Sequence, residues 1–264
     1  MIIDFHTHCF PGKIAEKAMQ QLCLRSGITE PWHNGTPESL LQVAKECGVD
    51  YSVVLNIATN PHQQTKVNDF AISLLDIQGL IPFGSVHPDS PDALIELERL
   101  KESGIKGVKL HPDYQGFFID EERMLPIYEK IGKLGLITVI HSGVDIGYPR
   151  PIHCTPEKLA SVLGAFGGAP VVAAHFGAMH MWSEVEEHLC GKDVYFDTAY
   201  CYGTLTPAFA KELIDIHGVD KILMGSDAPW NSPRQDISLV KCFGLSQDEE
   251  KAVLGGNAQR LLGL

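Results

Sequence analysis

The sequence lacks the features that would place this chain in a membrane, on nucleic acid or among disulfide-bonded secreted proteins. No apolar run in its 264 residues approaches the roughly 20 residues that span a bilayer. Its 21 basic and 33 acidic residues give a formal charge of −12, so we expect neither nucleic acid nor an anionic membrane as a partner. The seven cysteines are odd in number and include no C-x-x-C pair, which indicates reduced thiols. No basic and apolar leader is visible at the N-terminus, and together these absences predict a cytoplasmic protein.

Short apolar runs alternate with longer amphipathic segments along the whole sequence. The short runs predict strands at 1–7, 51–57, 80–86, 105–110, 136–141, 170–175, 193–198 and 221–226. Helix starts lie between them, with a capping side chain at Thr36, Thr155 and Ser246. Eight strand–helix units in roughly 250 residues predict an α/β fold, a (β/α)8 TIM barrel that forms a single domain over residues 1–264.

An open doubly wound sheet is the alternative arrangement of the same elements. Such a sheet normally has a glycine-rich nucleotide-binding turn after its first strand. This sequence has His6-Thr7-His8 there instead. A strand alternates its side chains between two faces, so His6 and His8 are expected to point the same way, as two ligands of one metal ion would.

Ionisable residues also stand where other predicted strands end. They are Lys109 and His111 after the fourth strand, His141 after the fifth, His175 after the sixth and Asp227 after the eighth. In a barrel the active site lies at the carboxyl ends of the strands. Burying so many ionisable groups without partners would be costly, so we interpret the set as a metal site.

Ordered motifs over nearly the whole chain resemble the amidohydrolase superfamily, and most of all its branch that includes aminocarboxymuconate-semialdehyde decarboxylase-like proteins. These motifs are Asp4-Phe5-His6-Thr7-His8, Gly107-Val108-Lys109-Leu110-His111-Pro112, His141-Ser142-Gly143, Ala174-His175-Phe176-Gly177 and Gly225-Ser226-Asp227-Ala228-Pro229-Trp230. The resemblance implies a TIM barrel of the metallo-dependent hydrolase type. It also implies that His6, His8, His141 and Asp227 bind one divalent metal ion. His175 and Asp227 would then be catalytic, moving protons at the metal's water.

Lys109 leaves the number of metal ions open. In binuclear amidohydrolases such as the phosphotriesterase-like enzymes, a carboxylated lysine on the fourth strand bridges two metals, which would give Lys109, His141 and His175 second-metal roles. In the mononuclear branch the lysine lines the pocket as a substrate contact, and the sequence around Lys109 favours this branch and one ion. A histidine and carboxylate set indicates Zn²⁺ and also accepts Mn²⁺, Fe²⁺ or Co²⁺.

Three further residues are weaker candidates for substrate binding. His111 shares a strand face with Lys109, and Trp230 follows Asp227 closely enough to form an apolar wall. Arg150 is either a partner for a substrate carboxylate or a solvated loop residue. The segment 25–36 has no clear pattern and is either a lid over the site or an ordinary surface loop.

Three functions remain open from the sequence. The first is a metal-dependent hydrolase, in which a metal-activated water attacks a small amide, lactone or ester. The second is a metal-dependent non-oxidative decarboxylase, a carbon–carbon lyase acting on a small carboxylic acid. The third is a barrel that binds metal without catalysis, which the complete set of candidate site residues disfavours. We expect a small-molecule substrate and, on base rates, a homodimer.

Overall fold

The computed structural model describes residues 1–148 and 150–264, which form two compact units. Unit 1 contains Met1–Val54, Gly79–Ile81 and Asp197–Leu264, and unit 2 contains Leu55–Gln78 and Pro82–Phe196. The prediction of a single domain stays a prediction, and each unit is best described by itself.

Within the described residues, eight strands alternate with helices in the order predicted from the sequence. The strands are β1 Ile3–Thr7, β2 Tyr51–Leu55, β3 Leu80–Phe83, β4 Gly107–Leu110, β5 Ile137–Ile140, β6 Val171–Ala173, β7 Tyr195–Asp197 and β8 Ile222–Leu223. All eight fall inside the predicted ranges. The predicted alternation of strand and helix is therefore confirmed.

The described helices alternate with these strands, and several of them begin at a capping side chain. In the described part of unit 1 they are α1 Gly12–Ser26, α2 Pro37–Cys47, α9 Pro207–His217, α10 Pro233–Lys241, α11 Gln247–Lys251 and α12 Asn257–Leu262. In unit 2 they are α3 Gln64–Ser73, α4 Ala93–Glu102, α5 Pro112–Gln115, α6 Leu125–Leu134, α7 Pro156–Val162 and α8 Trp182–His188. Thr36 and Ser246 form capping boxes at α2 and α11, and the Thr155 side chain accepts a hydrogen bond from Lys158 N at the start of α7. The predicted helix starts are thus confirmed.

In unit 1, β1 lies between β2 and the segment that begins with β8. It runs parallel to β2, with Ile3 opposite Tyr51. On its other side, Phe5 N donates a hydrogen bond to Met224 O at 2.8 Å. Because neighbouring parallel strands end at the same edge, the residues that follow β1 and β8 are brought together within this unit.

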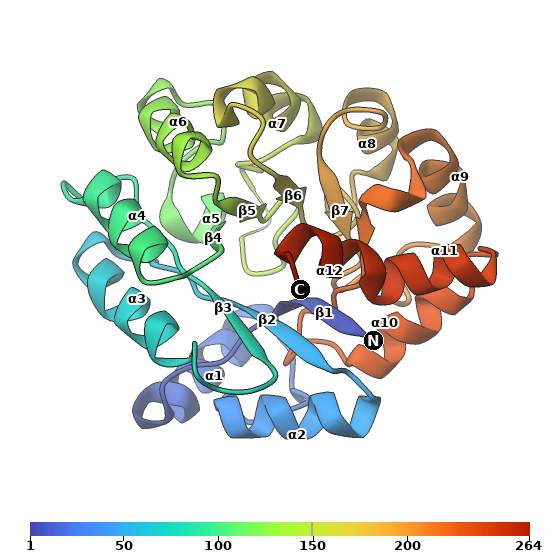
Figure 1. The fold of residues 1–264 in the computed structure, drawn as a ribbon, viewed down its shortest axis with the longest axis horizontal. Coiled ribbons are helices and arrows are strands. Elements are labelled where there is room, and N and C mark those ends of the chain that lie inside the picture. Colours follow the sequence, from blue (N-terminus) through green and yellow to red (C-terminus); the bar gives the residue numbers. More distant parts are fainter. Residues whose placement is uncertain (149) are drawn as a thin grey trace. The chain divides into compact units, whose positions relative to one another are not determined.

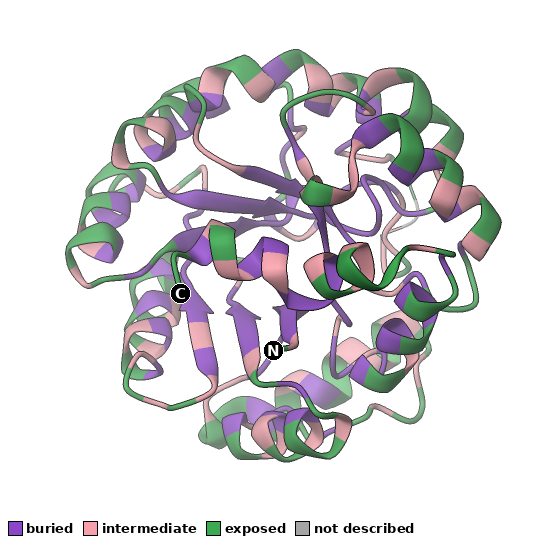
Figure 2. Cartoon of the chain, turned by 45° about the vertical axis from the view of Figure 1, so that its right-hand side comes forward, coloured by how far each residue is buried: buried purple, intermediate pink, exposed green. Residues whose placement is uncertain are grey.

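In unit 2, the strands β4, β5, β6 and β7 are hydrogen-bonded in that order, all parallel (Figure 1). Helices α4 and α6 pack against each other beside this sheet, as do α7 and α8. The strands β4, β5 and β6 are buried along their whole length, as expected for parallel strands covered on both faces. Figure 2 shows the same pattern: strands are mostly buried, while helices alternate between buried and exposed residues. No described helix is long and apolar enough to cross a membrane.

The strands are shorter than predicted, and at two of them the earlier end changes the position of a candidate residue. The strand predicted at 170–175 ends at Ala173, and the one predicted at 221–226 ends at Leu223. His175 and Asp227 lie in the turns that follow, with φ of 61° and 66°. For residues other than glycine this left-handed backbone is uncommon and is found disproportionately at functional sites. Turn geometry, rather than strand alternation, orients these two side chains.

Candidate metal centre

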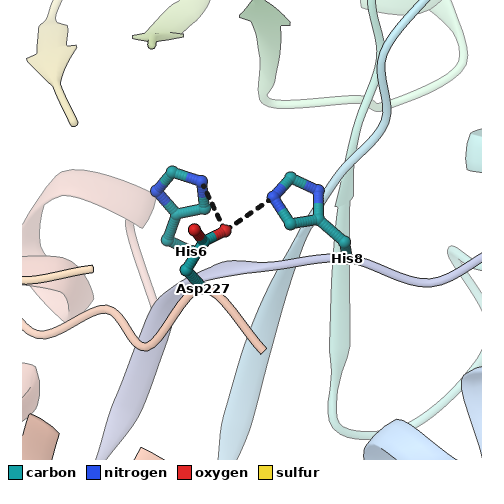
Figure 3. Close-up of side chains that lie close together, drawn as sticks. All are labelled: His6, His8 and Asp227. Atoms are coloured by element: carbon teal, nitrogen blue, oxygen red, sulfur yellow. Dashed lines mark hydrogen bonds and ion pairs between the residues drawn. The ribbon is translucent and has the colours of Figure 1, made fainter. Parts of the chain in front are cut away.

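Three ligand-type side chains converge in unit 1 (Figure 3). His8 Nε2 lies 3.0 Å from Asp227 Oδ1, and His6 Nε2 lies 3.5 Å from the same oxygen. The side chains are 1% (His6), 11% (His8) and 14% (Asp227) exposed, so the group is enclosed and still open on one side. Tetrahedral zinc, with bonds of about 2.1 Å, separates its donor atoms by about 3.4 Å. The two imidazoles and the carboxylate therefore fit a divalent metal ion in both chemistry and spacing.

The local backbone explains why these three residues meet. His6 and His8 are alternate residues of one extended segment and share a face, with ring centroids 5.2 Å apart. Asp227 N donates to His6 O at 2.8 Å, and His8 N donates to Ala228 O at 2.7 Å. A Cβ atom on Gly225 would lie 2.9 Å from His6 Cβ, so this close approach requires glycine. The motif around Asp227 is thus matched to the strand that carries the histidines.

Asp197 fixes the chemical form of His6. Its Oδ2 lies 2.8 Å from His6 Nδ1, and both side chains are buried. A carboxylate accepts the Nδ1–H proton, which leaves the lone pair of Nε2 facing Asp227 and available to a metal. Asp197 was not among the residues predicted from the sequence. Its position near the end of the seventh predicted strand could have identified it as a candidate site residue.

Asp4 supports the turn that carries Asp227. It accepts hydrogen bonds from Ser226 N at 2.9 Å and from Ser226 Oγ at 2.5 Å. Burial raises the pKa of Asp4 to about 7, and the bonds from Ser226 oppose that rise. Tyr200 lies beside the same turn, where its backbone N–H donates to Ser226 O at 3.4 Å, and burial and then the charge of Asp227 raise the pKa of its phenol. The turn that carries Asp227 is therefore held by the hydrogen bonds between Ser226 and Asp4, and the phenol of Tyr200 lies beside it.

A second group of ligand-type residues lies in unit 2. The rings of His111 and His141 stack at 4.1 Å with an interplanar angle of 7°. Asp145 Oδ2 lies 3.5 Å from His111 Nε2 and 3.8 Å from His141 Nε2. Asp145 was missed by the sequence analysis, since it lies in a loop four residues after His141 and follows no strand directly. This group also has the composition of a cation site.

His141 is joined to His175. His175 Nε2 lies 3.0 Å from His141 Nδ1, so a hydrogen bond joins the two rings. Trp182 Nε1 donates to His175 O at 3.1 Å and fixes the turn after β6. Asp113 Oδ2 lies 3.9 Å from His141 Nε2, and burial raises the pKa of Asp113. The pair of imidazoles has the geometry of a proton relay.

The predicted ligands belong to both compact units. His6, His8 and Asp227 lie together in unit 1, as expected. His141, predicted as their companion, lies in unit 2 with His111 and Asp145. Its role as a ligand of the same ion stays a prediction.

The remaining candidates occupy different surroundings. Lys109 is buried on β4, only 1% exposed, and its positive charge opposes the strong rise that burial causes in the pKa of Cys154. Trp230 is half-buried, and its backbone N–H donates to Asp227 O at 2.8 Å. Arg150 is exposed in the loop beyond β5. Their predicted contacts with substrate or a second metal stay predictions.

A family model described as "Amidohydrolase" matches residues 3–264 of the chain. The comparison of this chain with curated proteins found no match. Several solved structures do match over almost the full length of both chains, at low sequence identity.

One of them is an uncharacterized TIM-barrel protein from Bordetella bronchiseptica, 18% identical, with a TM-score of 0.76 and coverage of 99% of this chain and 98% of that one. Another is 5-carboxyvanillate decarboxylase from Sphingomonas paucimobilis, 16% identical, with a TM-score of 0.74 and coverage of 100% and 99%. A third is a probable 2-pyrone-4,6-dicarboxylic acid hydrolase from Acinetobacter baumannii, 18% identical, with a TM-score of 0.69 and coverage of 100% and 99%. At these identities the likeness establishes the fold, and the predicted α/β TIM barrel is confirmed.

Proposed function

Because this chain belongs to the amidohydrolase family, we propose that it is a metal-dependent enzyme that removes a carboxylate from a small organic acid by non-oxidative decarboxylation. The observation that carries the metal dependence is the convergence of His6, His8 and Asp227, whose ligand atoms all lie within 4.8 Å of one another. Decarboxylation is preferred because named decarboxylases outnumber named hydrolases among the similar solved structures. One Zn²⁺ per chain suits this set best, and Mn²⁺, Fe²⁺ and Co²⁺ share its preferences. The ion would supply positive charge where negative charge develops on the substrate.

The chain's own residues hold the ion and move protons. His6, fixed by Asp197, and His8 present Nε2, while Asp227 acts as ligand and proton shuttle. His175, bonded to His141, is the proposed proton carrier. In decarboxylation the bond between the carboxylate and its carbon breaks, carbon dioxide leaves, and the electron pair left on that carbon takes up a proton.

Hydrolysis, the first expectation from the sequence, is the second candidate. The named decarboxylase among the similar structures supports carbon–carbon cleavage, and the named pyrone hydrolase supports attack by water on a lactone. The same proton carriers serve either reaction: in hydrolysis they take a proton from water and deliver one to the leaving group. Lys109, His111, Arg150 and Trp230 are proposed substrate contacts in both.

Metal content tests the site directly. Wild type, His8→Ala and Lys109→Ala are purified without chelator or affinity-tag metal and measured by inductively coupled plasma mass spectrometry. His62→Ala, an exposed histidine in the turn Pro61–Gln63, is the matched control. We expect about one ion in wild type, Lys109→Ala and His62→Ala, and a large loss in His8→Ala. Two ions that fall together in Lys109→Ala would instead indicate a carboxylated bridging lysine, and no metal in wild type after zinc addition would refute the site.

The reaction class is tested with the metal-loaded protein. Carbon dioxide release from a panel of hydroxybenzoates and other small carboxylic acids is compared with acid release from lactones, esters and amides. His175→Ala should keep its metal and lose about 100-fold or more in kcat on whichever substrate is turned over. Turnover confined to the second panel would replace decarboxylation with hydrolysis.

A further inference from the structure

The loop between α1 and α2 is hydrogen-bonded to the segments of unit 1 that carry the candidate metal ligands His8 and Asp227. Trp32 N donates to Pro229 O at 2.9 Å, and Phe10 N donates to Gly35 O at 2.7 Å. Pro229 lies two residues beyond Asp227, and Phe10 lies two residues beyond His8. The segment from Trp32 to Gly35 is therefore held at both ends by the chain that carries the ligands.

His33 lies between these two anchors, and it is 6% exposed. Its Nδ1 lies 3.0 Å from Gly35 N, and because a backbone N–H can only donate, Nδ1 is the acceptor. Burial, reinforced by the nearby His8, lowers the pKa of His33 to about 4, so the ring is neutral at physiological pH. A neutral imidazole whose Nδ1 is unprotonated carries its proton on Nε2.

That Nε2–H is buried and has no hydrogen-bond partner among the described residues. A buried donor without an acceptor is costly, and natural proteins keep few of them. His33 is unsuited to bind the metal through Nε2, because that nitrogen bears the proton. An acceptor supplied by a bound molecule beside His8 would satisfy the donor.

We infer that the Nε2–H of His33 donates a hydrogen bond to a carboxylate or carbonyl oxygen of the substrate under the loop formed by residues 27–36. The inference rests on the proposed function and names a substrate-positioning residue for it. A fixed neutral donor selects oxygen acceptors over substrate groups that are themselves donors. Because the Nε2–H is buried, a hydrogen bond to it would lie in surroundings of low dielectric constant, which strengthen it.

Two substitutions distinguish the effect of the Nε2–H donor of His33 from that of the hydrogen bond between its Nδ1 and Gly35 N. In His33→Asn, the side-chain oxygen still accepts from Gly35 N, as in an Asx turn, and the Nε2–H is lost. In His33→Gln, the side-chain amide reaches the Nε2 position and keeps a donor there. The probe is acetohydroxamate, a small chelator with two oxygens, bound to Co²⁺-loaded protein and followed by the visible absorption of the cobalt. Metal content is measured on each variant beforehand.

We expect unchanged metal content in both variants, affinity for acetohydroxamate about tenfold weaker in His33→Asn, and affinity within about threefold of wild type in His33→Gln. Equal affinity in wild type and His33→Asn would overturn the inference, and so would loss of metal in His33→Asn, which would make His33 a ligand. Wild type that binds no metal would refute the proposed function instead.

A tautomer measurement on the wild-type protein makes the inference independent of folding in the variants. Long-range ¹H–¹⁵N spectra of protein labelled at histidine should show His33 protonated at Nε2. Protonation at Nδ1 would overturn the assignment of the donor, whether or not metal is present.

Discussion

Single contacts give two histidines of unit 1 opposite chemical roles. Asp197 takes the Nδ1–H of His6 and leaves the Nε2 lone pair for a metal. Gly35 N–H occupies the Nδ1 lone pair of His33 and leaves an Nε2–H donor. A neutral imidazole has one donor and one acceptor, so its fixed neighbour decides which of them faces the site.

Asp197→Asn should weaken zinc binding by about 10- to 100-fold, because the amide removes the negative charge that raises the basicity of His6. Asp215→Asn, an exposed carboxylate paired with Lys211 on α9, is the control and should bind zinc like wild type. Competition with a chromophoric chelator measures both affinities. Equal affinity in the two variants would show that Asp197 does not tune the ligand.

His33 should also make the metal-free protein sensitive to acid. Its pKa is about 4 in the folded chain against the ordinary histidine value of 6.5, so the unfolded chain binds more protons between these two values. The stabilising contribution of neutral His33 is present above pH 6.5 and is lost as the pH falls toward 4, by on the order of 3 kcal/mol at most.

His33→Asn lacks this titration. Urea unfolding at pH 7.5 and pH 5 should therefore show a smaller loss of unfolding free energy for His33→Asn than for wild type. Equal losses in the two proteins would mean that His33 titrates alike in the folded and unfolded chains.

At the scale of elements, the turns and caps place the site residues. Thr36 is the N-cap of α2 and the last residue of the loop that carries His33. A local capping signal therefore sets where that loop ends. The turns after β6 and β8 adopt left-handed backbone at His175 and Asp227. Close packing between elements also depends on small residues where backbones meet.

Gly132 in α6 provides a test of such packing. A Cβ atom there would lie 2.4 Å from Phe166 O, a backbone atom that cannot swing aside. Alanine in a helix interior normally stabilises by up to about 1 kcal/mol. Here overpacking should win, and Gly132→Ala should lower the unfolding free energy by about 1–3 kcal/mol.

Gly164→Ala is the matched control, since nothing lies within 4 Å of a Cβ atom at Gly164. Its unfolding free energy in urea should stay close to that of wild type. A stabilised Gly132→Ala would show that α6 moves away from Phe166 at little cost.

At the scale of the whole molecule, each compact unit carries its own group of ligand-type residues. His6, His8 and Asp227 belong to unit 1, and His111, His141 and Asp145 belong to unit 2. A ligand that binds only the folded chain stabilises it by mass action. Metal binding should therefore be visible in the stability of the entire protein.

Zinc at about 100 times its dissociation constant should add about 2.7 kcal/mol and raise the Tm by about 5–10 °C. His8→Ala should lose most of this rise, and His62→Ala should keep it. Differential scanning calorimetry with and without a chelator measures the shift. A rise that survives in His8→Ala would assign the stabilising ion to residues other than the proposed group.

The order of strands and helices could be predicted from the sequence, as could the shared face of His6 and His8 and the caps at Thr36, Thr155 and Ser246. Each of these follows from periodicity or from residues a few positions apart, where local geometry leaves few choices. The contacts of Asp197, Asp145 and His33, by contrast, became visible in the folded chain alone. Asp197 meets His6 across 191 positions of sequence, and such a contact depends on how strands pair. Likewise, the turn at Asp227 is set by backbone hydrogen bonds to β1, which no local pattern encodes.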